Sequence, residues 1–504
     1  MVWFSGSSRD ARLLFVCLSL AVAVVGAVCI VLSPVSSARA QAAGCEDRAQ
    51  SLRVPGADKQ EEYCLADLTT EGLVDGLHTN RSDWEGGIAL HALGTVNPPE
   101  PVSGIQVNGC FPDDSTTNGN PACDHDSQFV MRFPDDWNGR LVITGPPGNR
   151  TQYANDFVIS DYVLSKGYAF ASTDKGNTGN QFYEDGERPG DAVVEWHKRV
   201  EQLTRAAKPV VQQRYGTLPR YTYITGISNA GYLTRYALEN TPGLYDGGVD
   251  WEGTLFRRNG PNLFTFLPPA LRNYPECQAQ GFSGQACERM YNAGFEPGSE
   301  FLWPQHYDIY WDLTQRIYRE EFDPGYDGDR EEEDGIPGTP FCQNDGDPQT
   351  RCDAEYRYQN RPERVKEAVE RVSLTGNIGK PMLTLHGTYD ALLPIDADSN
   401  PYRELVEKAG KGNLHRYYKI AKGNHVDRFY NEFPEDGPSG QRELRPILPC
   451  HRAAFEELVE WVEKGNKPPP SKLVRKQESD DPVSGDVVNY CSINEEAVYS
   501  GPTD

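Results

Sequence analysis

Basic residues are scarce in this chain, which has 49 lysines and arginines against 74 aspartates and glutamates and a formal net charge of −25. No basic patch interrupts this acidic character. Nucleic acid and anionic lipid are negatively charged, so such a surface repels both. We therefore expect no nucleic-acid partner. The acidic composition suits a protein that stays soluble after export, and nothing in the sequence signals an oligomeric state.

Long hydrophobic runs are also missing, except near the N-terminus. Arg9 and Arg12 precede the uncharged stretch 13–32, and Ala38-Arg39-Ala40 follows it. A positive start, an apolar middle and a small-x-small end are typical of an export signal. We expect residues 1–40 to be a signal peptide cleaved after Ala40. The alternative is a retained membrane anchor, since the apolar stretch is long enough to span a bilayer. Both readings place the rest of the chain outside the cytoplasm, and cleavage makes it a secreted protein.

Cysteine spacings of the zinc-binding kind are absent. Two of the twelve cysteines fall in the export segment, and an even number in the exported part indicates disulfides. We expect sequential pairing, because each neighbouring pair brackets a loop rich in glycine, proline or aspartate. The expected pairs are Cys45–Cys64, Cys110–Cys123, Cys277–Cys287, Cys342–Cys352 and Cys450–Cys491.

The chain has no internal repeat, but its 504 residues are 38% hydrophobic and 11% aromatic, enough for a sizeable core. Strand-like and helix-like segments alternate from residue 127, lapse between 254 and 361, and then resume. Strands are expected at 128–133, 140–144, 168–172, 221–225, 381–385 and 415–420. Helices are expected at 156–166, 191–215, 232–240, 363–372 and 452–464.

This alternation predicts an α/β fold with a mostly parallel sheet covered by helices on both faces. The irregular stretch 254–361 holds two cysteine pairs and many aromatic residues, and it is expected to be an inserted, disulfide-rich lid. Its aromatics are expected to form either its own core or part of a pocket. The expected segments are the signal (1–40), an N-terminal region (41–126), the core (127–253 and 362–465), the lid (254–361) and a proline-rich tail (466–504).

A candidate nucleophile lies in the sequence Gly226-Ile227-Ser228-Asn229-Ala230-Gly231. It follows a predicted strand and precedes a predicted helix. A nucleophile elbow needs small residues two positions before and after the serine, because larger side chains would collide across the tight turn. Gly226 and Ala230 meet this requirement, so Ser228 is the predicted nucleophile.

The carboxylate and the base of a triad follow later in the chain. Asp390 comes just after the predicted strand 381–385, and His425 lies in a Gly-Asn-His turn after another strand. Of His415, His425 and His451, only His425 is expected in a loop beyond a strand end. The order serine, aspartate, histidine belongs to the α/β-hydrolase fold, whereas other serine hydrolases use different orders. We therefore predict that His425 is the general base and that Asp390 orients it.

The oxyanion formed in such a reaction needs backbone N–H donors. One is expected from Asn229, directly after the nucleophile. The second is expected from the loop Gly145-Pro146-Pro147-Gly148-Asn149, where the prolines have no N–H to donate. This leaves Gly145, Gly148 and Asn149, of which we favour Gly148 and Asn149. The alternative is that this loop is a plain surface turn.

With these motifs, residues 65–465 resemble an exported bacterial group of α/β-hydrolases that are tannase/feruloyl-esterase-like or 3-hydroxybutyrate-oligomer-hydrolase-like. The stretches 246–253 and 375–381 carry the resemblance beyond the serine motif. It implies an ester hydrolase with an inserted lid. Tannases and feruloyl esterases have cysteines directly before the nucleophile and before the histidine, where this chain has Ile227 and Asn424. The resemblance therefore does not imply galloyl or feruloyl specificity.

No cofactor is required by this chemistry, although an acidic run in the predicted lid offers a candidate calcium site. The run lacks the glycine and terminal glutamate of an EF-hand loop, which favours a solvated acidic loop instead. The calcium candidates are Asp323, Asp327, Asp329, Asp345 and Asp347.

The sequence thus predicts a secreted serine carboxylesterase that acts on a small or oligomeric ester, either a hydroxyacid oligomer or a plant-derived ester. An alternative is a serine aminopeptidase of the same fold, which requires an acidic cluster near Ser228 to bind a free amine. Glu252 or lid carboxylates are candidates for that cluster. A second alternative is an inactive binding scaffold built on the same fold.

Overall fold

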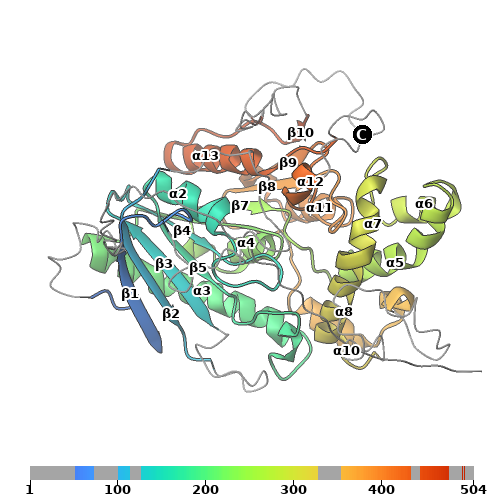
Figure 1. Ribbon diagram of the computed structural model, residues 1–504, viewed down its shortest axis with the longest axis horizontal. Helices are drawn as coiled ribbons and strands as arrows, with labels where there is room; N and C mark the ends of the chain where they lie inside the picture. Colours follow the sequence, from blue (N-terminus) through green and yellow to red (C-terminus); the bar gives the residue numbers. More distant parts are fainter. Residues whose placement is uncertain are drawn as a thin grey trace, which may run out of the picture. The chain divides into compact units, whose positions relative to one another are not determined.

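A ten-stranded sheet in the order β1-β2-β3-β5-β4-β6-β7-β8-β9-β10 forms the centre of the computed structural model (Figure 1). The structure describes residues 51–72, 100–113, 127–326, 353–432, 443–475, 491 and 493. The strands are β1 Lys59–Leu65, β2 Gly104–Cys110, β3 Gln128–Pro134, β4 Arg140–Thr144, β5 Ala169–Thr173, β6 Tyr221–Ile227, β7 Gly247–Trp251, β8 Met382–Gly387, β9 His415–Ile420 and β10 Lys472–Val474.

Pairing within the sheet changes from antiparallel to parallel along its width. The pairs β1–β2, β2–β3 and β3–β5 are antiparallel, and every pair from β5–β4 to β9–β10 is parallel. Strands β5, β7 and β8 are buried along their whole length, as expected where helices cover both faces of a parallel sheet. The carboxyl ends of β6, β8 and β9 therefore open on the same edge of the sheet.

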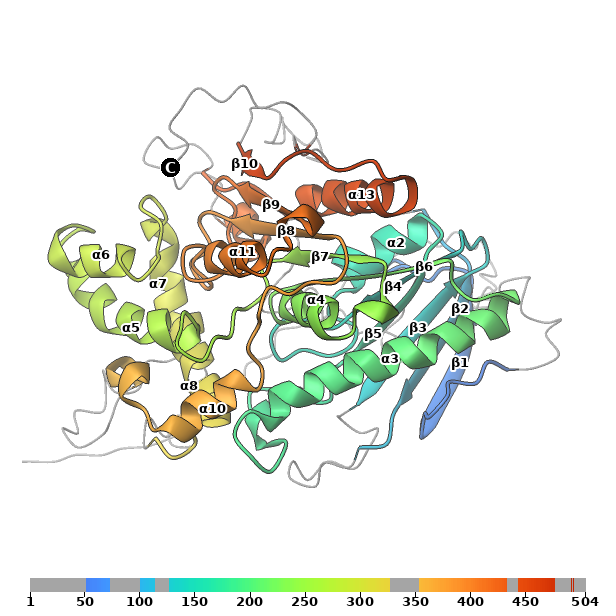
Figure 2. The same ribbon diagram turned by 180° about the vertical axis from the view of Figure 1, so that it is seen from behind.

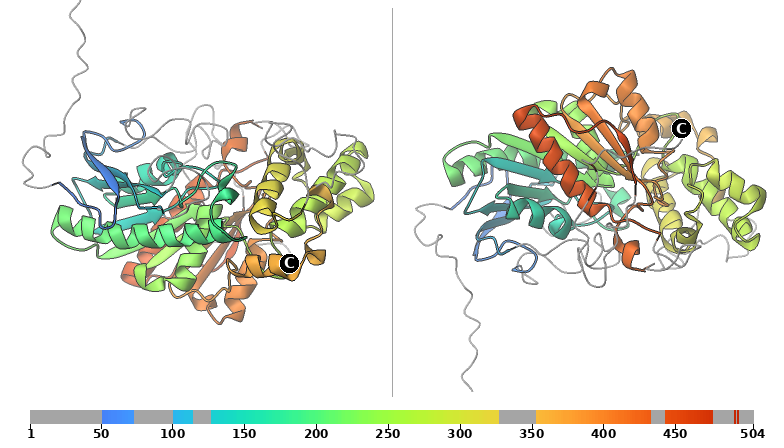
Figure 3. Two further views of the ribbon diagram at one scale, coloured as in Figure 1. Left: turned by 90° about the horizontal axis from the view of Figure 1, so that it is seen from below. Right: turned by 90° about the horizontal axis from the view of Figure 1, so that it is seen from above.

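Helices cover both faces. On one face lie α3 (Asp191–Tyr215), α4 (Asn229–Asn240) and α11 (Ser399–Lys408), which stand together in front of the sheet in Figure 2. On the other face α2 (Asp161–Ser165) contacts α13 (Leu448–Lys464), and the right-hand view of Figure 3 looks onto α13 in red. With the candidate serine on the turn between β6 and α4, this is the predicted α/β-hydrolase fold.

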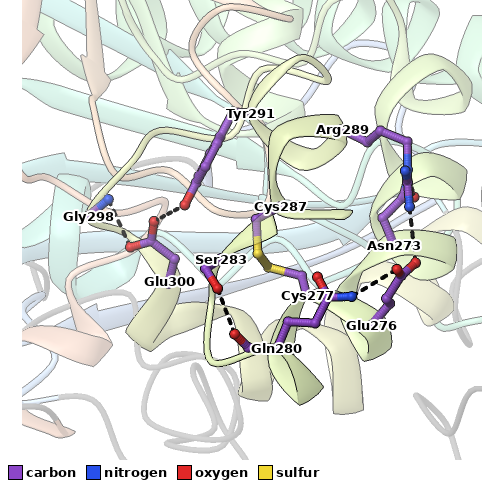
Figure 4. Close-up of a disulfide and its surroundings, with 10 residues drawn as sticks. All are labelled: Asn273, Glu276, Cys277, Gln280, Ser283, Cys287, Arg289, Tyr291, Gly298 and Glu300. Atoms are coloured by element: carbon purple, nitrogen blue, oxygen red, sulfur yellow. Dashed lines mark hydrogen bonds and ion pairs between the residues drawn. A yellow bond between two sulfur atoms is a disulfide. The ribbon is translucent and has the colours of Figure 1, made fainter. Parts of the chain in front are cut away.

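Between β7 and β8 the chain forms a helical insertion, a name used here for the described part of residues 254–361. Its helices are α5 Leu263–Ala279, α6 Gly284–Tyr291, α7 Trp303–Gln305 and α8 Trp311–Phe322. The predicted disulfide Cys277–Cys287 joins α5 to α6 (Figure 4). Beside it, Arg289 on α6 donates to Asn273 on α5 at 2.5 Å, which also fixes the angle between these helices.

Two helices beyond the insertion are α10 (Glu363–Glu370), at the predicted position, and α12 (Arg428–Glu432), which was not predicted. The observed bounds of α3, β4 and β9 agree with the predicted ranges. Helix α4 starts at Asn229 rather than 232, and α13 starts at Leu448 rather than 452, because the apolar periodicity on which a boundary prediction depends does not fix the first turn of a helix.

The sheet continues past β9 into the segment predicted as a proline-rich tail. Residues Lys472–Val474 form β10 and pair with Tyr418–Ile420 of β9. The predicted disulfide Cys450–Cys491 is present and tethers the tail to α13. Cys64 and Cys110 are disulfide-bonded as well.

Several predictions concern residues outside the described ranges. These are the export segment 1–40, the cysteines Cys45, Cys123, Cys342 and Cys352, and the acidic residues Asp327, Asp329, Asp345 and Asp347. Among the helices that the structure describes, none combines the length and apolar character needed to cross a bilayer.

Candidate active site

Ser228 occupies a strained turn between β6 and α4. Its backbone angles are φ 58° and ψ −119°, a conformation that costs energy for any residue with a side chain. A Cβ atom on Gly226 would lie 2.3 Å from the Cβ of Ala230, so a glycine is required two residues before the serine. The Ser228 amide donates to the Trp251 carbonyl of β7 at 2.9 Å and fixes the turn. This is the geometry of a nucleophile elbow.

Asp390 and His425 meet beyond the ends of β8 and β9. The Nδ1 atom of His425 lies 2.8 Å from Oδ2 of Asp390, and both side chains are buried. A carboxylate can only accept, so Nδ1 carries the proton and Nε2 is left as the basic nitrogen of the neutral ring. The structure therefore brings the predicted acid and base together from segments 35 residues apart.

The Asp390 carboxylate accepts four hydrogen bonds or close N–H contacts. Its Oδ1 accepts from the amides of Leu392 and Leu393 at 2.8 and 2.7 Å, and its Oδ2 lies 3.2 Å from Nε2 of His386 besides the contact with His425. Burial alone raises the pKa of Asp390, but the charge of His425 and these donors outweigh it and hold the pKa below its ordinary value. Asp390 is thus an anion fixed in place.

Asp390 in turn raises the basicity of the imidazole. Burial lowers the pKa of His425, but the charge and hydrogen bond of Asp390, together with the carboxyl group of Glu252, outweigh it and raise the pKa above its ordinary value. Ser228 and His425 line the same pocket. No hydrogen bond of the Ser228 hydroxyl occurs among the described residues.

Glu252 is a second carboxyl group at the imidazole. It directly follows β7, has a φ of 52°, and is fully buried. Its Oε2 lies 3.3 Å from Nδ1 of His425, while its Oε1 accepts from the Gly387 amide at 2.6 Å. Burial, and next the charge of Asp390, raise the pKa of Glu252 well above its ordinary value. Burial and the neighbouring Asp390 anion thus favour the protonated form of this carboxyl group.

This position overturns one expectation. The sequence offered Glu252 as a carboxylate that captures a substrate amine, but the side chain lies at the Nδ1 edge of the imidazole and does not line the pocket. The sequence did not indicate the contact of Glu252 with His425. The ends of β7 and β9 come close only because of the strand order in the folded sheet.

A buried polar network extends from Asp390 into the core. His386 connects to the hydroxyl of Ser399 at 2.6 Å, which accepts from Arg235 at 2.6 Å. Arg235 also pairs with Asp250 and Asp398 at 2.6 and 2.9 Å, all without solvent exposure of the guanidinium. The motif Leu385-His386-Gly387 contained His386, but the sequence did not indicate its role.

The pocket is mostly apolar and is lined by both the core and the helical insertion. The insertion contributes Leu263, His306, Tyr310, Leu313, Thr314, Ile317 and Tyr318, and the core contributes Phe182, Leu392, Leu393, Val426 and Phe429 among others. Some predicted lid aromatics thus face the pocket. Its polar groups include Asn229, Thr254 and Arg150, and none of the described residues that line it carries a carboxylate.

His306 is a polar lining residue that sequence analysis missed. Its Nδ1 lies 2.8 Å from the Leu302 carbonyl, which can only accept, so Nδ1 carries the proton. Burial lowers the pKa of His306 to about 4, so the ring is neutral near pH 7 and Nε2 is a bare acceptor. The ring lies beside those of Tyr310 and Phe429, within the apolar wall.

The three residues predicted to form the oxyanion hole, Gly148, Asn149 and Asn229, all line the pocket next to Ser228. Gly148 has a φ of 51°, which favours glycine. The loop is therefore part of the pocket wall and not a plain surface turn.

Within the described ranges, only Glu252, Asp390 and His425 form a group with metal-ligand spacing. The Asp390 oxygens already accept from the protein N–H groups described above. The calcium candidate Asp323 is buried and pairs with Arg361, and it also accepts from the Tyr356 hydroxyl at 3.1 Å. These contacts engage its Oδ2 atom, whereas Oδ1 lies 3.8 Å from Arg364 and has no hydrogen bond within the described residues.

Two families match different parts of the chain. The family described as tannase and feruloyl esterase matches residues 116–250, which include Ser228, and the 3HB-oligomer hydrolase family matches residues 348–489, which include Asp390 and His425. The predicted resemblance to this group of hydrolases is confirmed.

Curated relatives share a short region. The D-(-)-3-hydroxybutyrate oligomer hydrolase of Paracidovorax citrulli is 27% identical over 114 residues, and that of an Azoarcus species is 29% identical over 113 residues. Each match covers 22% of this chain and 16% of the relative. The matched region thus spans about a sixth of these relatives.

Solved structures with a related arrangement include feruloyl esterase B from Aspergillus oryzae, with 16% identity and a TM-score of 0.46 over 75% of this chain and 85% of that one. Tannin acyl hydrolase from Aspergillus niger has 14% identity and a TM-score of 0.46 over 83% and 85% of the two chains.

Proposed function

We propose that this protein is a serine carboxylic-ester hydrolase in which Ser228, His425 and Asp390 form the catalytic triad. The observation that carries the proposal is the 2.8 Å contact between His425 and Asp390 beside a serine held on a strained elbow in the same pocket. The family matches to ester hydrolases support the same reaction class.

The mechanism follows from the donors and acceptors. Ser228 Oγ attacks the ester carbonyl while Nε2 of His425 takes its proton, and Asp390 stabilises the imidazolium. The developing oxyanion accepts from backbone N–H groups of Asn229 and of the Gly148–Asn149 loop. The C–O bond then breaks and His425 returns the proton to the leaving alkoxide. Water, deprotonated by the same nitrogen, hydrolyses the acyl-enzyme and regenerates Ser228.

The lining of the pocket favours an ester whose acyl part is apolar and carries a hydroxyl group. The apolar wall binds the carbon skeleton, and the bare Nε2 of His306 accepts a hydrogen bond from the hydroxyl. Oligomers of short hydroxyacids combine both features, and the curated relatives are named as hydrolases of such oligomers. No described residue that lines the pocket carries a carboxylate to bind a free amine, which favours an esterase over an aminopeptidase.

We further propose that the protein is exported and that residues 1–40 are removed. The observed disulfides fit an oxidising compartment outside the cytoplasm. Mass spectrometry of the protein recovered from a native-like host, in medium and membrane fractions, tests this proposal. A mature N-terminus at Gln41 in the medium supports it, and an intact N-terminus in the membrane fraction contradicts it.

The activity is tested with a substrate panel on purified protein. The panel contains a short-chain nitrophenyl ester, a 3-hydroxybutyrate dimer, methyl gallate, ethyl ferulate and an aminoacyl anilide. We expect hydrolysis of the first two, loss of activity in the Ser228→Ala variant, and stoichiometric labelling of Ser228 by a fluorophosphonate. An inactive scaffold would show neither hydrolysis nor labelling, and faster cleavage of the anilide than of the esters would contradict the esterase assignment.

A further inference from the structure

The carbonyl oxygen of Gly148 is held by two donors from different parts of the fold. It accepts from Nζ of Lys175, which follows β5, and from Nδ2 of Asn229, at the start of α4, both at 2.9 Å. Gly148 lies in the loop after β4 and has a φ of 51°. Side chains from two elements thus fix the direction of one carbonyl group in the pocket wall.

Fixing this carbonyl also fixes the next N–H. The peptide bond between Gly148 and Asn149 is trans, so its C=O and N–H groups point in opposite directions. The Asn149 N–H therefore points away from Lys175 and the Asn229 side chain. In the part of the chain that the structure describes, this N–H has no acceptor, while the Asn149 carbonyl accepts from Gly179 at 2.8 Å.

The Asn229 amide is itself oriented by two hydroxyl groups. Its Oδ1 accepts from Tyr318 of α8 at 2.9 Å and from Thr254 at 3.2 Å. With Oδ1 occupied by donors, Nδ2 must be the atom that faces Gly148. Because Tyr318 belongs to the helical insertion, a continuous chain of hydrogen bonds connects the insertion to the loop beside the nucleophile.

Lys175 is fully buried, which is rare for a lysine side chain. Its Nζ lies 5.0 Å from the centre of the Trp196 ring, and the Gly148 carbonyl is its hydrogen-bond partner among the described residues. Its φ of 74° adds backbone strain. Burial lowers the pKa of Lys175 to about 7, and a buried lysine side chain that donates to one carbonyl is costly unless that carbonyl must be held.

We propose that Lys175, Tyr318 and the side chain of Asn229 are positioning residues that hold the Gly148 carbonyl and thereby direct the Asn149 N–H into the oxyanion hole. The assignment rests on the proposed serine-hydrolase function. It makes the helical insertion a part of transition-state stabilisation in addition to a wall of the pocket.

The test compares kcat and KM for the nitrophenyl ester in Lys175→Met and Tyr318→Phe with those of the wild type. Loss of an oxyanion donor costs roughly 10²–10³ in kcat, so loss of its alignment is expected to cost roughly 10- to 100-fold in kcat with little change in KM. The inhibition constant of a boronic acid, whose tetrahedral adduct occupies the hole, should rise by the same factor. The inhibition constant of a carboxylate product should stay unchanged.

Tyr232→Phe is the matched control. Tyr232 is also a buried tyrosine, and its hydroxyl donates to the Val372 carbonyl at 2.8 Å, outside this chain of hydrogen bonds. It should lose stability but keep kcat. Because Tyr318→Phe retains the packed ring, it remains informative if Lys175→Met does not fold.

The outcomes separate the two proposals. Unchanged kcat in the folded variants, or an equal loss in Tyr232→Phe, overturns the positioning role. Absence of Ser228-dependent hydrolysis in the wild-type protein overturns the proposed function instead.

Discussion

The carboxyl group of Glu252 lies 3.3 Å from Nδ1 of His425, at the same nitrogen that contacts Asp390. Two acidic side chains at one imidazole nitrogen can coexist because burial and the charge of Asp390 favour the neutral form of Glu252. The raised pKa of Glu252 and the lowered pKa of Asp390 separate these states.

A protonated Glu252 predicts that Glu252→Gln is nearly neutral for catalysis, whereas Glu252→Ala is damaging. Glutamine reproduces the shape of the neutral acid and keeps an acceptor for the Gly387 amide, but alanine leaves that amide without its partner. We expect kcat/KM of the glutamine variant within about threefold of the wild type, and that of the alanine variant lower by at least tenfold.

Stability measurements at several pH values give an independent check. A carboxyl group whose pKa is raised on folding contributes stability that is present below its ordinary pKa and is lost as the pH rises through the folded-state pKa. The melting temperature of Glu252→Gln relative to the wild type should therefore increase with pH above about 4.5. A constant difference would show that Glu252 is ionised in the folded protein.

Asp390→Asn should lower kcat by about 10⁴, because an amide cannot stabilise the imidazolium and favours the wrong tautomer. It should also lower the pKa of His425, since the charge of Asp390 is the main influence that raises it. The titration of the His425 imidazole by NMR measures this shift, and the acid limb of kcat/KM in the wild type should lie above the ordinary histidine value of about 6.5. An acid limb below that value would contradict the raised pKa.

Arg235→Met should destabilise the fold strongly. It leaves the carboxylates of Asp250 and Asp398 buried without their cation, and loss of one partner of a buried ion pair costs about 3–5 kcal/mol. Chemical denaturation measures the loss. Arg403→Met, which breaks the exposed pair with Glu407, is the control and should change stability by no more than about 0.5 kcal/mol.

His306→Phe should discriminate between substrates with and without a hydroxyl group. The substitution keeps an aromatic ring but removes the acceptor, so kcat/KM for a 3-hydroxybutyrate dimer should fall about tenfold. The butyrate ester without the hydroxyl should be hydrolysed as before, and His306→Gln should restore part of the loss. Equal effects on both substrates would rule out the hydroxyl contact.

Much of the fold could be predicted from local sequence. Local patterns predict strands at the apolar runs 140–144 and 415–420, and the small residues around Ser228 predict the nucleophile elbow. The order of these motifs along the chain indicates the α/β-hydrolase fold. Glu252, His386 and Lys175 carried no such signal. Their contacts depend on which strands are neighbours in the sheet and on the length of each loop. Neither property can be predicted from the identity of one buried residue.

The same limit applies to the sheet edge. The three-residue strand β10 is too short and too close to the prolines 468–470 to show a periodic pattern. Its pairing is determined by contacts across the chain, including the donation from Arg445 to the Val474 carbonyl at 3.1 Å.

Strand β10 also closes a row of backbone groups that β9 would otherwise present to solvent. The loop that carries His425 begins where β9 ends, and the Ala421 amide at this junction donates to Val474 of the tail at 3.0 Å. The far carboxyl-terminal segment therefore buttresses the general base from outside the hydrolase core. A recombinant form that ends after α13 would leave the backbone groups of β9 unpaired close to His425. We expect this one deletion to cause both self-association and impaired catalysis.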